Sequence, residues 1–589
     1  MAVFVLDKSE DNIFFNEKYY KENHIVKSTI FRLKEWTLHL AFHNIQEELK
    51  NVYTKNNIGG LLIGTVLYCG YDSNTVLKSI TEDFLNNTLN LDNLKGNYVL
   101  IFWRGNDIFI LNDKLGVQPI FYDKNSNRYS SSFLLLLKNS KSKFKINQDA
   151  FLEKLATGFI SGSDTLVIGI SKILPSSVYL HNKNISIKWI KHSYQQLDEI
   201  EFHSSGKKES IKTQMQVLGD YFNSINNSFS NEIGDLGLSS GFDCRLILGL
   251  GEKHLNDKLH LHSHNTNGVH DIEIKYATKL ASLYNSNLNL IPTERLESLN
   301  NQSLEKILTE NLNFFDGNSA RHLGAFSQTY TYLYKKATMG NATYSLNGLG
   351  GEIYRDSYFT GNKKMTWNDW VNRYVFLPFS KEAVGSSETL KTTADYIRSK
   401  LESQLEVDYD KMDIFSTHAY YGLIKMPQCN GSVASAYGKV SPFLFPFIEY
   451  EIILEALKAI PYLGIGGQYQ AQLIRNISPK LARVGSHYGF SFDKLSVKYL
   501  LWSKLKTLGS VNKRTHLVKT KLEKRLSSPT HLKFLQYFNN NLILNEAKEI
   551  LLTFSPKTNF DKLLIESTQK RYIIYLAFSL RKLNKHIEI

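Results

Sequence analysis

Residues 236–245 read Leu-Gly-Leu-Ser-Ser-Gly-Phe-Asp-Cys-Arg, and an apolar run to residue 250 follows them. We expect a strand that ends in a small-residue turn and a helix that begins after it. A helix N-terminus offers unpaired N–H groups and a positive dipole end to an anion. Ser239 and Ser240 can add hydroxyl donors, and Asp243 can hold a magnesium ion against phosphate oxygens. The segment predicts either a nucleotide-phosphate site or an ordinary strand–helix turn.

Two further motifs follow in the chain. Residues 345–352 read Ser-Leu-Asn-Gly-Leu-Gly-Gly-Glu, and residues 446–449 read Pro-Phe-Ile-Glu, with another proline at position 461. Taken alone, the first is compatible with a glycine-rich turn after a strand, and the second with plain core packing.

Strands and helices alternate around the first motif. We expect a strand at 259–265, a helix at 271–284 with an apolar stripe, and a strand at 288–291. Such alternation predicts a parallel α/β sheet, in which ligands bind outside the carboxyl ends of the strands.

The first third of the chain has a different pattern. Apolar runs at 98–103 and 108–111 flank the turn residues Gly-Asn-Asp, which predicts a hairpin. Further strands are expected at 120–123 and 128–133. Consecutive short strands with tight turns predict an antiparallel sheet.

The order of these segments resembles the asparagine synthetase-like family. The segments 96–103, 111–122 and 129–132 resemble its N-terminal glutaminase-type domain. There Asp113, Gly116, Pro119 and Tyr122 fit the family loop, and Asn112 stands where the family has Arg. Residues 239–244 are similar to the Ser-Gly-Gly-x-Asp-Ser pyrophosphate loop of the ATP pyrophosphatases. Residues 345–352 and 446–461 resemble two other synthetase segments. The β-lactam synthetases and lasso peptide cyclases are similar relatives.

The resemblance implies two domains. Residues 1–195 would form a glutaminase-like, Ntn-hydrolase-type antiparallel β domain. Residues 215–589 would form a parallel-sheet α/β ATP pyrophosphatase domain with helical additions. The polar stretch between 190 and 230 is where we place the boundary.

The resemblance also implies a ligase that releases AMP and pyrophosphate. A carboxylate of a small molecule or peptide, aspartate or an analogue, would attack ATP, and ammonia or a substrate amine would capture the acyl adenylate. Asp243 and Glu352 would hold Mg²⁺. The residues expected to bind ATP are Leu238, Ser239, Ser240, Gly241, Asp243, Cys244, Arg245, His264, Gly348 and Gly350.

Several positions depart from the family. The glutaminase needs an N-terminal cysteine as nucleophile, whereas Ala2 follows Met1 and the first cysteine is Cys69. We therefore expect no glutamine hydrolysis. Leu349 replaces a polar residue near the reacting carbonyl. The family's catalytic lysine is replaced by His487, with Arg483 as a neighbouring cation. The alternative is a catalytically decayed protein of this fold that binds a nucleotide or a partner.

Composition and charge bear on three further classes of protein: disordered chains, nucleic-acid-binding proteins and zinc proteins. Of 589 residues 42% are hydrophobic, which excludes a disordered chain. The net charge of +14 attracts anions but is spread along the chain, so nucleic acid is not expected despite the basic stretch 504–525. No CxxC pair exists, which argues against a thiolate zinc site.

No signal peptide or membrane span is expected, so we expect a cytoplasmic protein. A homodimer is a further expectation. The alternating His260, His262 and His264 share one strand face; we expect packing or hydrogen bonding rather than a metal site.

Overall fold

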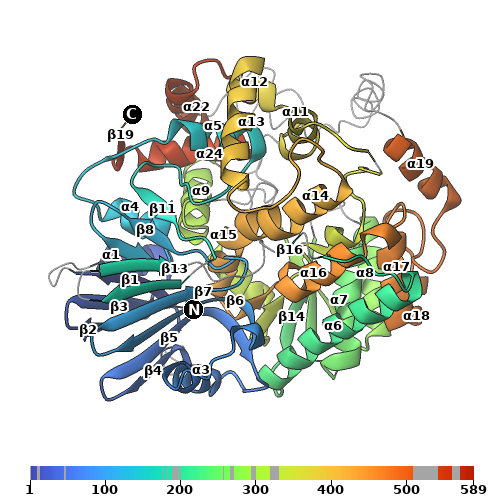
Figure 1. Ribbon diagram of the computed structural model, residues 1–589, viewed down its shortest axis with the longest axis horizontal. Coiled ribbons are helices and arrows are strands. Elements are labelled where there is room, and N and C mark those ends of the chain that lie inside the picture. The colour runs from blue at the N-terminus through green and yellow to red at the C-terminus, as the bar shows by residue number, and fades with distance from the viewer. Residues whose placement is uncertain are drawn as a thin grey trace.

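The computed structural model describes residues 2–8, 14–44, 48, 50–175, 177–181, 184–188, 197, 200–256, 258–265, 271–293, 300–318, 331–361, 363–508, 542–559 and 571–588. Figure 1 shows two antiparallel sheets on the left and a parallel sheet with its helices on the right. This mixed α/β architecture confirms the expected division into an antiparallel N-terminal part and a parallel C-terminal part.

The N-terminal part is a sandwich of two six-stranded antiparallel sheets. Their inner faces meet in one apolar core, where Phe4 and Leu40 of one sheet lie in the same cluster as Ile101 and Ile110 of the other. The first sheet has the order β11(Ile170–Lys172), β8(Phe121–Asp123), β9(Arg128–Ser130), β1(Ala2–Asp7), β3(Trp36–Phe42), β2(Lys27–Leu33). The second has the order β13(Asn184–Lys188), β12(Ser177–His181), β7(Asp107–Asn112), β6(Leu94–Arg104), β5(Ile58–Tyr68), β4(Val52–Lys55).

The predicted hairpin is β6 and β7, whose residues pair from Arg104–Asp107 to Val99–Asn112. The strand expected to run to residue 133 ends at Ser130 instead. The reason is local, because the Ser132 hydroxyl accepts from the Leu135 N–H and starts α4. The short elements of this part are α1(Glu17–Asn23), α3(Val76–Leu85), η1(Leu91–Asn93), α4(Phe133–Lys138), β10(Phe144–Lys145) and α5(Gln148–Thr157).

The C-terminal sheet is parallel, in the order β16(Leu288–Pro292), β15(Leu259–Asn265), β14(Gly234–Gly237), β17(Tyr344–Leu346), β18(Phe443–Leu444). The chain starts at the centre with β14 and builds outward through β15 and β16, with α7(Phe242–His254) and α8(Asp271–Leu283) between them. It then returns to the other side of β14 with β17 and β18. The strand order therefore reverses between β14 and β17, which is where ligands bind in open α/β sheets.

Helices form most of the rest of the C-terminal part, and some of them lie away from this sheet, next to α5 (Figure 1). The described helices of this part are α6(Lys207–Ser228), α9(Asn301–Phe314), α10(Tyr332–Thr338), η5(Gly351–Tyr354), α11(Trp367–Trp370), η6(Val371–Val375), α12(Ser380–Val384), α13(Ser387–Leu401), α14(Ile414–Ala419), η7(Tyr420–Lys425), α15(Met426–Gly438), η8(Pro446–Ile448), α16(Tyr450–Lys458), η9(Ile460–Tyr462), α17(Gln468–Ile477), α18(Pro479–Arg483), α19(Val497–Leu508), α22(Leu542–Phe554) and α24(Arg571–Leu583). The expected domain start at residue 215 falls inside α6, whose buried face packs on α7, α16 and α17.

Many contacts join the two parts, among them the following three. Glu449, which follows η8, accepts a 2.8 Å hydrogen bond from the backbone N–H of Gly96 in β6. Asp316, after α9, accepts from the N–H groups of Phe133 and Leu134 at the start of α4. The last strand, β19(Ile587–Glu588), pairs with β10 of the N-terminal part. The two parts are therefore held by polar contacts and by a returning C-terminus, and residues of both, such as Phe133 and Leu346, lie in one apolar core.

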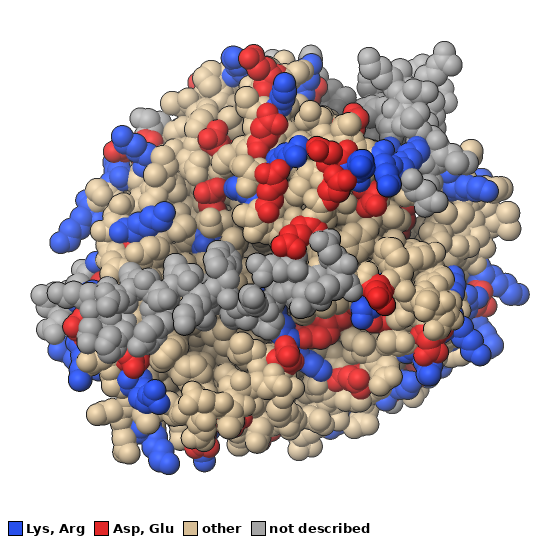
Figure 2. All heavy atoms as spheres, in the orientation of Figure 1, with Lys and Arg blue, Asp and Glu red and all other residues tan. Residues whose placement is uncertain are grey.

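In the part of the chain that the structure describes, no helix is both long enough and apolar enough to span a bilayer. Most of the basic stretch 504–525 lies outside the described residues. Over the face shown in Figure 2, basic and acidic side chains are intermingled.

Candidate functional site

The first and second motifs lie side by side at the carboxyl edge of the parallel sheet. β14 pairs with β17 in register, with Asp235 opposite Ser345 and Leu236 opposite Leu346. The loops that leave these two strands must therefore emerge at the same edge. The first loop leads into α7, whose N-terminal residue is capped by Gly241 in an extended conformation. The second loop leads into η5.

The two loops touch where glycines leave room. A Cβ on Gly351 would lie 2.1 Å from Oδ1 of Asp243, and one on Gly348 would lie 3.2 Å from the Asp243 Cβ. Gly350 has φ +96, a conformation that favours glycine, and a Cβ there would lie 2.9 Å from the Phe447 carbonyl oxygen. The three glycines thus bring the first, second and third motifs into direct contact.

Asp243 lies in the first turn of α7 and accepts from two side chains. Gln470 Nε2 lies 2.7 Å from Oδ1, and Arg355 Nη2 lies 3.1 Å from Oδ1 and 3.0 Å from Oδ2. Burial raises the pKa of Asp243 to about 6, although the Arg355 charge opposes this rise. The carboxylate is therefore largely ionised at neutral pH and titrates just below it.

Glu352 shares the same guanidinium. Its Oε1 lies 3.3 Å from Arg355 Nη2, and its Oε2 accepts a 2.6 Å hydrogen bond from the Tyr421 hydroxyl. The structure thus brings Asp243 and Glu352 together at one point. Carboxylate oxygens are the donors that Mg²⁺ prefers, but the guanidinium of Arg355 lies between these two. As arranged, the pair does not fit a shared Mg²⁺.

The serines of the first loop are engaged within the protein. The Ser239 hydroxyl accepts from the Gly241 N–H at 3.2 Å. The buried Ser240 hydroxyl lies 2.8 Å from Nδ1 of His487 and accepts from the His487 N–H at 3.1 Å. Leu238 is buried and its N–H donates to the His262 carbonyl. Burial raises the pKa of the Cys244 thiol, which leaves it protonated and a weak donor.

Arg245 is among the residues expected to bind ATP, but its side chain is engaged within the protein. The side chain is fully buried. Its guanidinium donates to the carbonyl oxygens of Ser240, Leu481, Val484 and Gly485 at 2.6–3.1 Å. Because its charge is directed at backbone carbonyls, Arg245 fastens the segment after α18 to the first loop.

His487 and Arg483 are the residues expected to supply positive charge for catalysis. Burial lowers the pKa of His487, and the Arg245 charge adds to this effect while Glu273 opposes it. The lowered pKa disfavours the charged imidazolium that the resemblance implies at this position. Arg483 is exposed at the end of α18, and Lys480 pairs with Glu252.

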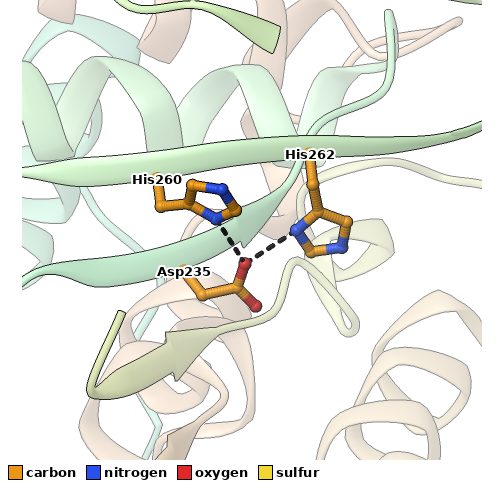
Figure 3. A group of neighbouring side chains, drawn as sticks. All are labelled: Asp235, His260 and His262. Carbon is orange, nitrogen blue, oxygen red and sulfur yellow. Dashed lines mark hydrogen bonds and ion pairs between the residues drawn. The ribbon is translucent and has the colours of Figure 1, made fainter. Parts of the chain in front are cut away.

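His264 lies at the end of β15, where its Nδ1 is 3.0 Å from the Tyr334 hydroxyl. His260 and His262 instead point at Asp235 of β14, as Figure 3 shows. Their Nδ1 atoms lie 3.5 Å and 2.7 Å from Oδ1 of that carboxylate. Three potential metal-ligand atoms thus lie within 4.8 Å of one another. The alternating pattern in the sequence drew attention to the histidines, but it did not identify Asp235 as their hydrogen-bonding partner.

The other oxygen of Asp235 is also occupied. Lys335 Nζ of α10 lies 2.7 Å from Oδ2, and the Ser345 hydroxyl donates to the same atom at 3.1 Å. Burial would raise the pKa of Asp235, but Lys335 and the two histidines outweigh it and hold that pKa well below its usual range. A buried carboxylate with a lysine counter-ion and three other donors is a satisfied ion network. This arrangement agrees with the expected hydrogen bonding of the histidines.

The position expected to carry a glutaminase nucleophile is filled by Ala2, which begins β1 and is buried. It borders a small cavity of about 20 Å³ that is also lined by Gln118, Ser131 and Lys439. None of the three cysteines, all of which are described, lines this cavity. Cys69 is exposed beyond the end of β5.

Comparison with protein families gives one match. Residues 69–195 match the family described as "Glutamine amidotransferase domain". The match spans β6 to β13, within the antiparallel part. Comparison with curated proteins gives no match. The chain therefore carries an amidotransferase-type domain in its N-terminal part, of the kind found in enzymes that form C–N bonds.

We predict that Gly351→Ala disrupts the junction of the two loops. The new Cβ would overlap Oδ1 of Asp243, and overpacking of this kind costs about 1–3 kcal/mol of unfolding free energy. Thermal unfolding is the measurement, with Gly237→Ala as the control, because a Cβ there meets its nearest atom, His262 Nε2, at an ordinary 3.4 Å. Equal stability of the two variants would contradict the close approach.

We predict that Lys335→Met strongly destabilises the protein. It leaves Asp235 buried without its counter-ion, and breaking a buried pair from one side costs about 3–5 kcal/mol. Denaturant unfolding at pH 7 measures this, and the exposed neighbour Lys336→Met serves as the control. The double variant Asp235→Asn/Lys335→Met is expected to recover part of the loss. A single variant as stable as the control would refute the network.

Proposed function

We propose that this chain is an ATP-dependent, AMP-forming ligase of the asparagine synthetase type. The observation that supports it is the convergence of the 238–243 and 347–352 loops at the strand-order reversal between β14 and β17. The N-terminus of α7, with its free N–H groups, faces the same edge. An amidotransferase-type domain precedes this site in the chain, as expected for an enzyme that joins carbon to nitrogen.

In this proposal the loop before α7 binds the phosphates of ATP. A substrate carboxylate attacks the α-phosphorus and pyrophosphate leaves. An amine then attacks the acyl carbon of the adenylate, AMP leaves, and the amine loses a proton to form the amide. The backbone N–H groups of the first turn of α7 would stabilise the charge that accumulates on pyrophosphate. The hydroxyl of Ser240 would act indirectly, because its bonds to His487 fix the segment 486–490 against the loop.

The amine would not come from glutamine hydrolysed at the start of β1. Ala2 offers a methyl group there, and no cysteine lines its cavity. We propose that ammonia, or an amine of a larger substrate, is used instead. Purified protein with glutamine should release no glutamate above a heat-treated sample, while glutamate release would overturn this part.

A second candidate is a decayed protein of the same fold that binds a nucleotide or a partner. Arg355 favours it, because this side chain occupies the point between the two carboxylates. The lowered pKa of His487 favours it as well, because it disfavours a positive charge at this position.

We predict acid-stimulated exchange of labelled pyrophosphate into ATP. The assay combines protein, Mg-ATP and a panel of carboxylic acids that includes aspartate and carboxyl-terminated peptides. Asp243→Asn should lower exchange by about 100-fold, because it weakens the contacts with Arg355 and Gln470 that position the first turn of α7. Asp395→Asn, on the exposed face of α13, is the matched control and should retain full exchange.

Pyrophosphate exchange that persists in Asp243→Asn would mean that adenylation does not occur at the site formed by these two loops. ATP binding without exchange for any acid in the panel would favour the decayed protein.

A further inference from the structure

The four carboxylate oxygens of Asp243 and Glu352 are all engaged by donors of this chain. Arg355 Nη2 reaches both oxygens of Asp243 and the Oε1 of Glu352. Gln470 donates to Asp243 Oδ1, and Tyr421 donates to Glu352 Oε2. A metal ion shared by the two carboxylates would have to displace at least the guanidinium.

Arg355 is held in this position by its surroundings. Only 14% of its side chain is exposed. The guanidinium lies 5.3 Å from the ring centroid of Phe242, which gives a cation–π contact. A Cβ on Gly467 would lie 3.3 Å from Arg355 Cδ, so the backbone of that glycine packs against the stem. The side chain is therefore packed within the site and does not extend into solvent.

The charges reinforce the geometry. The carboxylates of Asp243 and Glu352 raise the pKa of Arg355, against the opposing effect of burial, so the guanidinium is always charged. A divalent ion placed next to this fixed positive charge in a partly buried site would be repelled. The guanidinium and a metal ion shared by both carboxylates therefore exclude each other.

We infer that Arg355, and not a divalent metal ion, is the resident cation between Asp243 and Glu352. The inference deepens the proposed function, and it rests on it only in treating this edge of the sheet as the nucleotide site. A metal ion that arrives with ATP would then be held by phosphate oxygens and not by both carboxylates. Arg355 fixes the second loop to α7 before any nucleotide binds.

The test is a titration of the full chain with Mn²⁺ in the absence of nucleotide. Electron paramagnetic resonance measures the bound Mn²⁺ at each point. Mn²⁺ binding by the native protein should be the same with and without the Asp243→Asn substitution. Arg355→Gln should gain one site per chain, at least about ten-fold tighter than any site of the native protein, because two adjacent carboxylates then lack a counter-ion. Arg355→Gln/Asp243→Asn should lose the gained site.

The matched control is Arg398→Gln. Arg398 also lies between two carboxylates, those of Glu402 and Asp410, at 2.7 Å and 3.5 Å, but on the surface of the protein. This variant should bind Mn²⁺ like the native protein. Circular dichroism confirms that each variant is folded, and Arg355→Lys, which keeps the charge, should gain no site.

Two results would overturn the inference. One is a Mn²⁺ site in the native protein that Asp243→Asn abolishes; the other is a folded Arg355→Gln that gains none. A separate experiment tests the proposed function independently of this inference. Calorimetric titration measures ATP binding, once in EDTA and once in Mg²⁺. Failure of ATP to bind in either condition would refute the nucleotide site, while the Mn²⁺ result still decides the role of Arg355.

Discussion

The candidate site depends on one close approach, that of the Asp243 carboxylate to the backbone of Gly351. Any side chain at position 351 would overlap the carboxylate oxygen. The approach is possible because β14 and β17 are adjacent parallel strands, so that their loops leave the sheet together. The third motif depends on the same packing, because Gly350 rests against the Phe447 carbonyl. A fixed point of contact at the strand-order reversal thus joins segments that are far apart in sequence.

Charged groups within this frame are arranged mainly to hold segments in place. Arg245 fastens α18 and the residues that follow it to the first loop through four carbonyl oxygens. Lys335 pairs with the charge of Asp235 in β14, and two histidines lie within hydrogen-bonding distance of the same carboxylate. Arg355 joins the second loop to α7. The residues that remain available to a ligand at this edge are mostly backbone N–H groups, whose direction is set by the helix itself.

Strands β6 to β9, β15 and β16, the parallel arrangement of the C-terminal sheet and the places of the two loops could be predicted, because glycines and apolar runs mark them along the chain. The order of the strands in the sheets was not predicted. The partners of single side chains could not be predicted either. Asp235 meets His260 and His262 only through the register of β14 with β15, which no local pattern reveals. Arg245 follows Asp243 closely in sequence, yet points into the core and not toward a phosphate. Arg355 lies three residues after Glu352, and nothing local indicates that it also reaches Asp243.

The central claim is that the two loops together form one nucleotide site. Hydrogen–deuterium exchange with and without a non-hydrolysable ATP analogue tests it directly, because bound phosphates would protect the backbone N–H groups of the first turn of α7. The account predicts slower exchange in peptides covering 238–246 and 347–355 together, with no change in the hairpin of β6 and β7. Unchanged exchange in both loops at saturating analogue, or protection confined to the N-terminal part, would contradict it.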